Sequence, residues 1–152
     1  MDKPLVAIVG RPNVGKSTLF NRLVGRRIAL VEDMAGITRD REFVVIDTGG
    51  IILNERDPLK AEVTVQAKVA VDEADVILFM VDAVSGVTPE DRDIANSLRG
   101  ATKPVFVVAN KADNQSREAD ASEFYELGFG DLYPISALNG RGVGDLLDAA
   151  VA

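Results

Sequence analysis

Cysteine and histidine are both absent from this chain of 152 residues. It can therefore form no disulfide and no zinc site with thiolate or imidazole ligands, and it cannot use histidine as a catalytic acid or base. The longest apolar run, residues 76–81, is too short to cross a bilayer, and no long apolar segment follows the charged N-terminus. We expect a cytoplasmic protein that does not bind membranes and whose chemistry relies on carboxylates, lysine, backbone amides and metal ions.

Acidic residues outnumber basic ones, and the formal net charge is −7. A domain with this charge does not present an overall basic surface to nucleic acid, so any contact with RNA must be local. Apolar residues make up 47% of the sequence, which is enough for an ordinary core at this length. Since no repeat, low-complexity tract or flexible linker divides the chain, we predict a single domain over residues 1–152.

The most informative segment is Gly-Arg-Pro-Asn-Val-Gly-Lys-Ser, which runs from Gly10 to Ser17 directly after an apolar run. Glycines at both ends let the backbone turn tightly and present its N–H groups to phosphate oxygens. Lysine adds a positive charge, the serine hydroxyl can bind the Mg²⁺ that bridges the phosphates, and the helix that begins here points its positive end at the same anion. A strand-to-helix turn that binds nothing is the alternative. The predicted phosphate-binding residues are Gly10, Asn13, Val14, Gly15, Lys16, Ser17 and Thr18.

Short apolar runs rich in β-branched residues alternate with segments that carry helix start and stop signals. Such runs are typical of strands buried on both faces of a parallel sheet. The predicted strands are residues Leu5–Val9, 43–46, 76–81, 105–109 and 133–135, and the predicted helices are Lys16–Val24, 58–72, Pro89–Leu98, 122–127 and Val143–Ala150. This alternation predicts an α/β fold with a doubly wound, mostly parallel sheet, in which ligands bind at the carboxyl ends of the strands.

Asp47-Thr48-Gly49-Gly50 follows the second predicted strand. A carboxylate at a strand end can hold Mg²⁺ through water, and the backbone N–H of Gly50 can approach the terminal phosphate. By itself this pattern is weak, because a strand that ends in aspartate before a glycine turn is common in α/β proteins.

Asn110-Lys111-Ala112-Asp113 follows the fourth predicted strand. One aspartate can accept hydrogen bonds from the adjacent N1–H and amino group of guanine, a pattern that adenine does not offer, so Asp113 predicts guanine selectivity. Asn110 would either tie this segment to the phosphate loop or meet the purine edge, and the stem of Lys111 would cover one face of the ring.

Ser136-Ala137-Leu138 follows the last predicted strand and completes the order of motifs. We expect the backbone N–H of Ala137 to donate to the guanine carbonyl. Taken alone, Ser-Ala-Leu is an ordinary loop sequence, and its significance comes from its place behind the three other motifs.

With these motifs the chain resembles the Ras-like, translation-factor-related GTPases, which have the phosphate-loop NTPase fold. Residues 36–40, Gly-Ile-Thr-Arg-Asp, and residues 123–130, Glu-Phe-Tyr-Glu-Leu-Gly-Phe-Gly, occur together with the second glycine of Asp-Thr-Gly-Gly. These segments narrow the resemblance to the first GTPase domain of the Der (EngA) family of bacterial ribosome-assembly GTPases, in the branch that includes Era and MnmE. The resemblance covers essentially the whole chain.

The resemblance implies a Mg²⁺-dependent enzyme that hydrolyses GTP to GDP and phosphate as a conformational switch. Thr38 would close over Mg²⁺ and the terminal phosphate, so that Ser17, Thr38 and Asp47 form the metal site. Family members carry two GTPase domains and a further C-terminal domain, and their partner is the large ribosomal subunit. The chain is therefore expected to be one GTP-binding domain of a longer protein.

Three other functions fit parts of this pattern. A nucleotide-dependent regulatory module with little turnover would use the same motifs, as would the GTPase domain of a tRNA-modification protein similar to MnmE. A phosphate-loop kinase that uses ATP is disfavoured by Asn-Lys-Ala-Asp at residues 110–113.

Ile51 stands where Ras-like enzymes place the glutamine that orients the attacking water, and an isoleucine cannot do this. The resemblance implies that relatives with an apolar residue here hydrolyse GTP with the help of K⁺. Asn13 matches the position that binds K⁺ in MnmE, so we count it with Lys16, Thr38 and Gly50 among the catalytic residues. The alternative for Asn13 is a turn residue whose amide braces the loop.

Two further features are open to interpretation. The arginines around the loop and switch, Arg22, Arg26, Arg27, Arg39 and Arg41, are best read as a solvated face, with contact to rRNA or charge stabilisation as alternatives.

Only eight residues separate Thr38 from Asp47, too few for an edge strand, a turn and a second strand. We therefore expect a longer segment between Asp40 and Arg41 in the natural protein. A true deletion would instead leave five strands, all parallel.

Overall fold

The computed structural model describes residues 5–11, 13–24, 44–47, 71–100, 102–114 and 121–150. Five strands form one sheet in the order β2-β1-β3-β4-β5, and every pair of neighbours is parallel. The strands are β1 (Leu5–Val9), β2 (Val44–Asp47), β3 (Val76–Asp82), β4 (Val105–Asn110) and β5 (Leu132–Pro134). Because the strands are parallel, their carboxyl ends all lie at one edge of the sheet, which is where the predicted motifs follow in the sequence.

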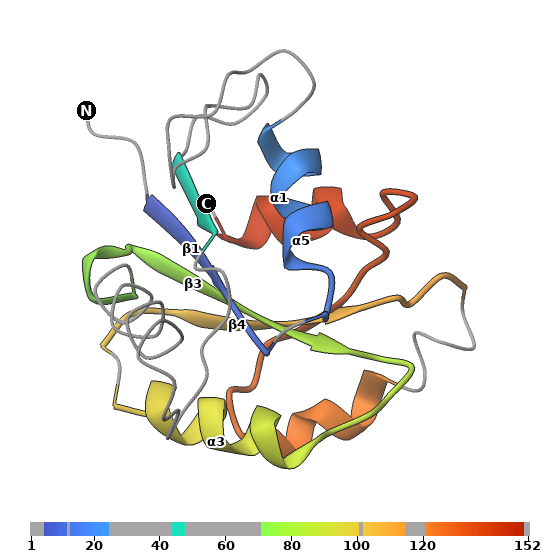
Figure 1. The fold of residues 1–152 in the computed structure, drawn as a ribbon. Helices are drawn as coiled ribbons and strands as arrows, with labels where there is room; N and C mark the ends of the chain where they lie inside the picture. The colour runs from blue at the N-terminus through green and yellow to red at the C-terminus, as the bar shows by residue number, and fades with distance from the viewer. Residues whose placement is uncertain are drawn as a thin grey trace.

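Helices cover both faces of this sheet (Figure 1), as the doubly wound prediction requires. α1 (Lys16–Val24) and α5 (Val143–Ala150) pack on one face, and α3 (Pro89–Leu98) and the 3₁₀ helix η1 (Ala121–Leu127) pack on the other. Successive side chains of a strand point to opposite faces, so Ile8 and Leu78 are buried with α1 and α5, whereas Ala7 and Phe79 are buried with α3 and η1. The central strand β3 is buried along its whole length.

Local sequence signals explain where the helices begin. Thr88 caps α3: its hydroxyl accepts a hydrogen bond from the Asp91 backbone N–H, and the Asp91 carboxylate accepts one from the Thr88 N–H. Pro89 stands at the first helical position, where its missing N–H costs nothing. The predicted bounds of α1, α3 and α5 are confirmed. Among the described residues, no helix has both the length and the apolarity that crossing a membrane requires.

The predicted strands are confirmed with small shifts of their ends. β3 and β4 each continue one residue further than predicted, so that Asp82 and Asn110 are still paired within the sheet, and β5 begins and ends one residue earlier. Most of the predicted helix 58–72 lies outside the described residues, as do Asp40 and Arg41. The residues on both sides of that junction, 25–43, are outside the described part of the chain, so the five described strands fit either alternative. Whether a longer segment separates them in the natural protein stays a prediction.

Candidate nucleotide-binding site

The two glycines of the loop between β1 and α1 stand where the backbone has no room for a side chain. A Cβ atom on Gly10 would lie 2.7 Å from the carbonyl oxygen of Met80 in β3. Gly15 has a φ of +99°, and a Cβ atom there would overlap the side-chain amide of Asn110. Glycine is therefore required at both ends of the loop because β3 and β4 approach the backbone closely. This reason is separate from the expected role of glycine in presenting backbone N–H groups to phosphate.

Lys16 opens α1 and is buried, with 6% of its surface exposed. Its ammonium group donates a hydrogen bond of 2.9 Å to the carbonyl of Arg11, across the loop. A buried ammonium held over a turn of backbone N–H groups forms a positive cradle for an anion. Asn13, at the outer side of this loop, is exposed and has a φ of 69°, a turn conformation that asparagine tolerates better than most residues.

Arg11 carries a second positive charge in the loop, but its side chain points to α3. Its guanidinium donates a hydrogen bond of 2.7 Å to the Ser85 hydroxyl, and its Nε lies 3.3 Å from a carboxylate oxygen of the fully buried Asp91. The Nε–carboxylate contact lacks hydrogen-bond geometry and acts as an ion pair. The side chain of Arg11 thus anchors the phosphate loop to Ser85 and to the start of α3.

Asn110 joins the two halves of the site. Its side-chain nitrogen donates a hydrogen bond of 2.9 Å to the carbonyl of Val14, and its side-chain oxygen accepts one of 2.9 Å from the backbone N–H of Ala137. The residue is almost completely buried. Of the two roles expected for Asn110, the structure shows the bracing contact to the phosphate loop.

We expected the backbone N–H of Ala137 to donate to guanine, but it already donates to the side chain of Asn110. Contact with a guanine carbonyl would require this N–H to be shared. The neighbouring Ser136 is buried, and its hydroxyl accepts a hydrogen bond from the Asn139 N–H, so it shapes the turn. Leu138 is 80% exposed and Asp113 is also exposed, as residues that meet a ligand from outside must be.

Lys111 and Asp82 form an ion pair that sequence reasoning missed. The ammonium of Lys111 lies 2.8 Å from a carboxylate oxygen of Asp82, and the other carboxylate oxygen accepts hydrogen bonds from the N–H groups of Val84 and Ser85. Burial raises the pKa of Asp82, but the Lys111 ammonium and the two N–H groups outweigh it and hold that pKa below its ordinary value. Asp82 therefore stays ionised at neutral pH and fixes the end of the Lys111 side chain. The backbone of Lys111 has a φ of 69°.

The residues predicted to hold Mg²⁺ are only partly described. Ser17 and the adjacent Thr18 lie exposed in the first turn of α1. Asp47 is the last residue of β2 and pairs in register with Ile8 of β1, two residues before Gly10, so its backbone lies at the same sheet edge as the phosphate loop. Hydroxyl and carboxylate oxygens are the ligands that Mg²⁺ prefers, so the donor set fits this ion. Thr38 and Gly50 lie outside the described residues, as does Ile51.

Arg22 is exposed, as our interpretation of a solvated face requires, but its guanidinium also bonds to the loop after β5. Its Nε donates a hydrogen bond of 2.6 Å to the carbonyl of Ala137, and a terminal nitrogen donates one of 2.7 Å to the carbonyl of Leu138. The other four arginines of the predicted cluster lie outside the described residues: Arg26, Arg27, Arg39 and Arg41.

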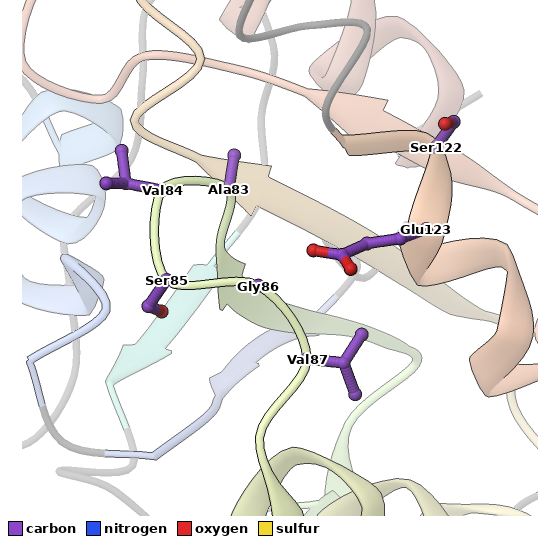
Figure 2. Close-up of a pocket in the computed structure, with 7 residues that line it drawn as sticks. All are labelled: Ala83, Val84, Ser85, Gly86, Val87, Ser122 and Glu123. Carbon is purple, nitrogen blue, oxygen red and sulfur yellow. The ribbon is translucent and has the colours of Figure 1, made fainter.

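A separate cavity of about 470 Å³ lies between the loop that follows β3 and the start of η1. Figure 2 shows the Glu123 carboxylate pointing from η1 towards this loop. The lining residues are Ala83, Val84, Ser85, Gly86, Val87, Ser122 and Glu123. None of them was predicted to bind nucleotide, but one wall of the cavity is the segment that bonds to Asp82 and Arg11.

Sequence reasoning missed the contacts of Asp82, Arg11 and Arg22, and only the role of Asp82 could have been predicted. Asp82 ends a buried apolar run, the same signal that singled out Asp47, and the rule could have been applied to it. Arg11 and Arg22 have no such signal. Their acceptors include backbone carbonyls and residues from 74 to 116 positions away, which no local pattern specifies.

Comparison with known proteins agrees with this geometry. Residues 5–111 match the family model described as "50S ribosome-binding GTPase". A protein named GTPase Der from Latilactobacillus sakei subsp. sakei is 53% identical over 162 residues, which cover 100% of this chain and 37% of that protein. The chain thus spans little more than a third of the relatives that it matches. Since the chain has 152 residues, ten aligned positions have no counterpart in it.

Solved structures give the same picture. The chain superimposes on Era from Aquifex aeolicus bound to GDP and AlF₄⁻ with a TM-score of 0.81 and 34% identity, over 98% of this chain and 56% of that one. A structure of Era with MgGDPNP and a segment of 16S ribosomal RNA gives a TM-score of 0.81 and 36% identity, with the same coverage. These matches support the Ras-like phosphate-loop fold. The relatives named GTPase Der favour the resemblance to the Der family over the alternative similar to MnmE.

Proposed function

The chain belongs to the family of 50S ribosome-binding GTPases, and we propose from this that it binds GTP with Mg²⁺ and hydrolyses it to GDP and phosphate. The bridge made by Asn110 is the observation that carries the proposal. Its amide holds the carbonyl of Val14 in the phosphate loop and the N–H of Ala137 in the loop after β5. One buried side chain therefore keeps a phosphate-binding segment and a purine-binding segment at a fixed separation.

The phosphates of the nucleotide would occupy the loop from Gly10 to Ser17. The ammonium of Lys16, which donates to the Arg11 carbonyl, would exchange that bond for a stronger one to an ionised phosphate oxygen. The N-terminus of α1 adds its partial positive charge at the same place. Apart from this exchange at Lys16, the N-terminus of α1 is in place before the ligand arrives, so little backbone reorganisation opposes the stabilisation of charge that develops during phosphoryl transfer.

Guanine would be recognised by Asp113, whose carboxylate accepts from the N1–H and the amino group of the base. Lys111 would lie along one face of the purine, and its ammonium is anchored by Asp82 at 2.8 Å. Adenine presents an acceptor at the position where Asp113 needs a donor, so the site is selective for guanine nucleotides.

Ser17, Thr38 and Asp47 would hold Mg²⁺, which when bound neutralises charge on the phosphate oxygens. The backbone N–H of Gly50 would contact the terminal phosphate. Since Ile51 cannot orient the attacking water, we propose that Asn13 holds a K⁺ ion near the phosphates and that K⁺ stimulates hydrolysis.

We further propose that the domain is part of a longer protein that uses the GTP cycle as a switch in assembly of the large ribosomal subunit. The relatives named GTPase Der, of which the chain spans 37% or slightly less, support this proposal. The net charge of −7 requires that any contact with rRNA be local or made by other parts of that protein.

Two measurements test the proposal. Titration calorimetry with GDP and ADP should show binding of GDP and much weaker binding of ADP; equal affinities would reject the guanine site. Single-turnover hydrolysis of GTP in the presence of Mg²⁺ should give a slow but measurable rate, as in unassisted GTPases. Tight binding of GTP without phosphate release would favour a regulatory module instead of an enzyme.

A further inference from the structure

Arg22 connects the helix that follows the phosphate loop to the loop that follows β5. It is the basic residue in the last turn of α1, and its guanidinium donates to two successive backbone carbonyls, of Ala137 at 2.6 Å and Leu138 at 2.7 Å. Hydrogen bonds from a charged donor are about twice as strong as neutral ones. The planar guanidinium can donate from two nitrogens at once, which the single ammonium of lysine cannot reproduce in the same geometry.

The loop held by Arg22 is fixed from two sides. The N–H of Ala137 donates to Asn110, whose amide in turn donates to Val14 of the phosphate loop, while the carbonyl of Ala137 accepts from Arg22. The contacts close a ring that runs from the phosphate loop along α1, through Arg22 and Ala137, and back through Asn110. Both backbone groups of Ala137 are thereby engaged, and the position of the loop is set by α1 and β4 together.

Gly140 leaves the space that this arrangement needs. It has a φ of +90°, and a Cβ atom there would lie 2.9 Å from a terminal nitrogen of Arg22. The turn itself is closed by a hydrogen bond of 2.7 Å from the Gly140 N–H to the carbonyl of Ser136. The turn at residues 136–140 is thus built around the guanidinium, so the contact is part of the loop's architecture.

We propose that Arg22 is a positioning residue for guanine recognition. It acts through the backbone of Ala137 and Leu138, which it holds against α1, so that the base-binding loop and the phosphate-binding helix keep one relative position. This inference rests on the proposed function, because it assigns to Arg22 the placement of the loop that meets the base. Without Arg22 the loop loses these two bonds to α1, while the bond from the Ala137 N–H to Asn110 remains.

The test compares the binding of GDP and of ADP to Arg22→Ala, Arg22→Lys and the unchanged protein by titration calorimetry. We expect Arg22→Ala to weaken GDP binding about tenfold, since two charge-assisted hydrogen bonds no longer fix the loop. ADP gains nothing from a correctly placed loop, so its binding should change less than about twofold, and the selectivity for GDP should fall. The GDP affinity of Arg22→Lys should lie between that of Arg22→Ala and that of the unchanged protein. Arg92→Ala is the matched control, because Arg92 is an exposed helical arginine that pairs only with the exposed Glu126 in the described part of the chain.

The outcomes separate the inference from the proposed function. If the unchanged protein does not prefer GDP to ADP, the proposed function fails. If it prefers GDP and Arg22→Ala keeps the same ratio of affinities, the positioning role of Arg22 is overturned, even if the melting temperature falls, because a purely structural contact would affect both nucleotides alike. Should Arg22→Ala not fold, the ratio measured with Arg22→Lys decides in the same way.

Discussion

The ammonium of Lys111 lies 2.8 Å from the carboxylate of Asp82, a residue that ends the neighbouring strand β3. Asp82 and Asn110 pair in register, so the residue after Asn110 reaches back over the end of β3. The same carboxylate accepts the N–H groups of Val84 and Ser85. One acidic side chain thus organises both the lysine of the proposed base-binding segment and the loop that lines the separate cavity.

The ion pair between Lys111 and Asp82 makes the free energy of unfolding depend on pH. The folded pKa of Asp82 is lowered, so in the interval between the folded and the unfolded pKa the unfolded chain binds the proton and the folded protein does not. The contribution of Asp82 is therefore fully present above the ordinary aspartate pKa of about 3.9 and is lost as the pH falls through the folded pKa. Urea denaturation at pH values from 7 down to 3 should show a smaller acid-induced loss for Asp82→Asn than for the unchanged protein. The exposed Asp93→Asn on α3 should match the unchanged protein. Parallel pH curves for Asp82→Asn and the unchanged protein would contradict this.

Asn110→Ala should destabilise the protein and weaken nucleotide binding together. The substitution leaves the carbonyl of Val14 and the N–H of Ala137 without their buried partner, which we expect to cost about 1–3 kcal/mol in the free energy of unfolding. Urea denaturation measures the first effect and calorimetry with GDP the second. Asn96→Ala, at an exposed position of α3, is the control. Unchanged GDP affinity in a folded Asn110→Ala protein would show that the bridge does not set the site.

Asp113→Ala should remove the preference for guanine. Sites built around specific hydrogen bonds discriminate by roughly 10⁴-fold or more, so the ratio of GDP to ADP affinity should fall by several orders of magnitude. Because Asp113 is exposed, the melting temperature should stay nearly constant. The control is Asp131→Ala, an exposed aspartate just before β5. A ratio that survives in Asp113→Ala would place guanine recognition elsewhere.

Hydrolysis should be faster in K⁺ than in Na⁺, by about tenfold or more, and Asn13→Ala should abolish the difference. Asn13 is exposed in a left-handed turn, so its amide is accessible to a cation without rearrangement of the core. Single-turnover rates in the two salts, for both proteins, provide the measurement. GDP affinity should be the same in both proteins if the asparagine acts on the reaction and not on binding. Equal rates in K⁺ and Na⁺ would leave Asn13 as a turn residue.

The alternation of apolar runs with capped helices was sufficient to predict the parallel sheet, three helices with their bounds and the edge at which the motifs gather. The helix bounds follow from contacts between residues close in sequence, such as the capping pair of Thr88 and Asp91. The glycines of the phosphate loop were also predictable, although their close approach to Met80 and Asn110 was not, because it depends on which strands become neighbours.

Only the tertiary structure decided which partners the charged side chains of the site take. Lys111 pairs with Asp82, which lies 29 positions away, and Arg22 bonds to carbonyls 115 and 116 positions away. A backbone carbonyl has the same chemistry in every residue, so nothing in the sequence marks those of Ala137 and Leu138 as acceptors. The sequence by itself determined that the motifs proposed to bind phosphate and guanine share one sheet edge. The distances between these motifs are set by the order of the strands and by the packing of α1 on the sheet. No local sequence pattern encodes either of them.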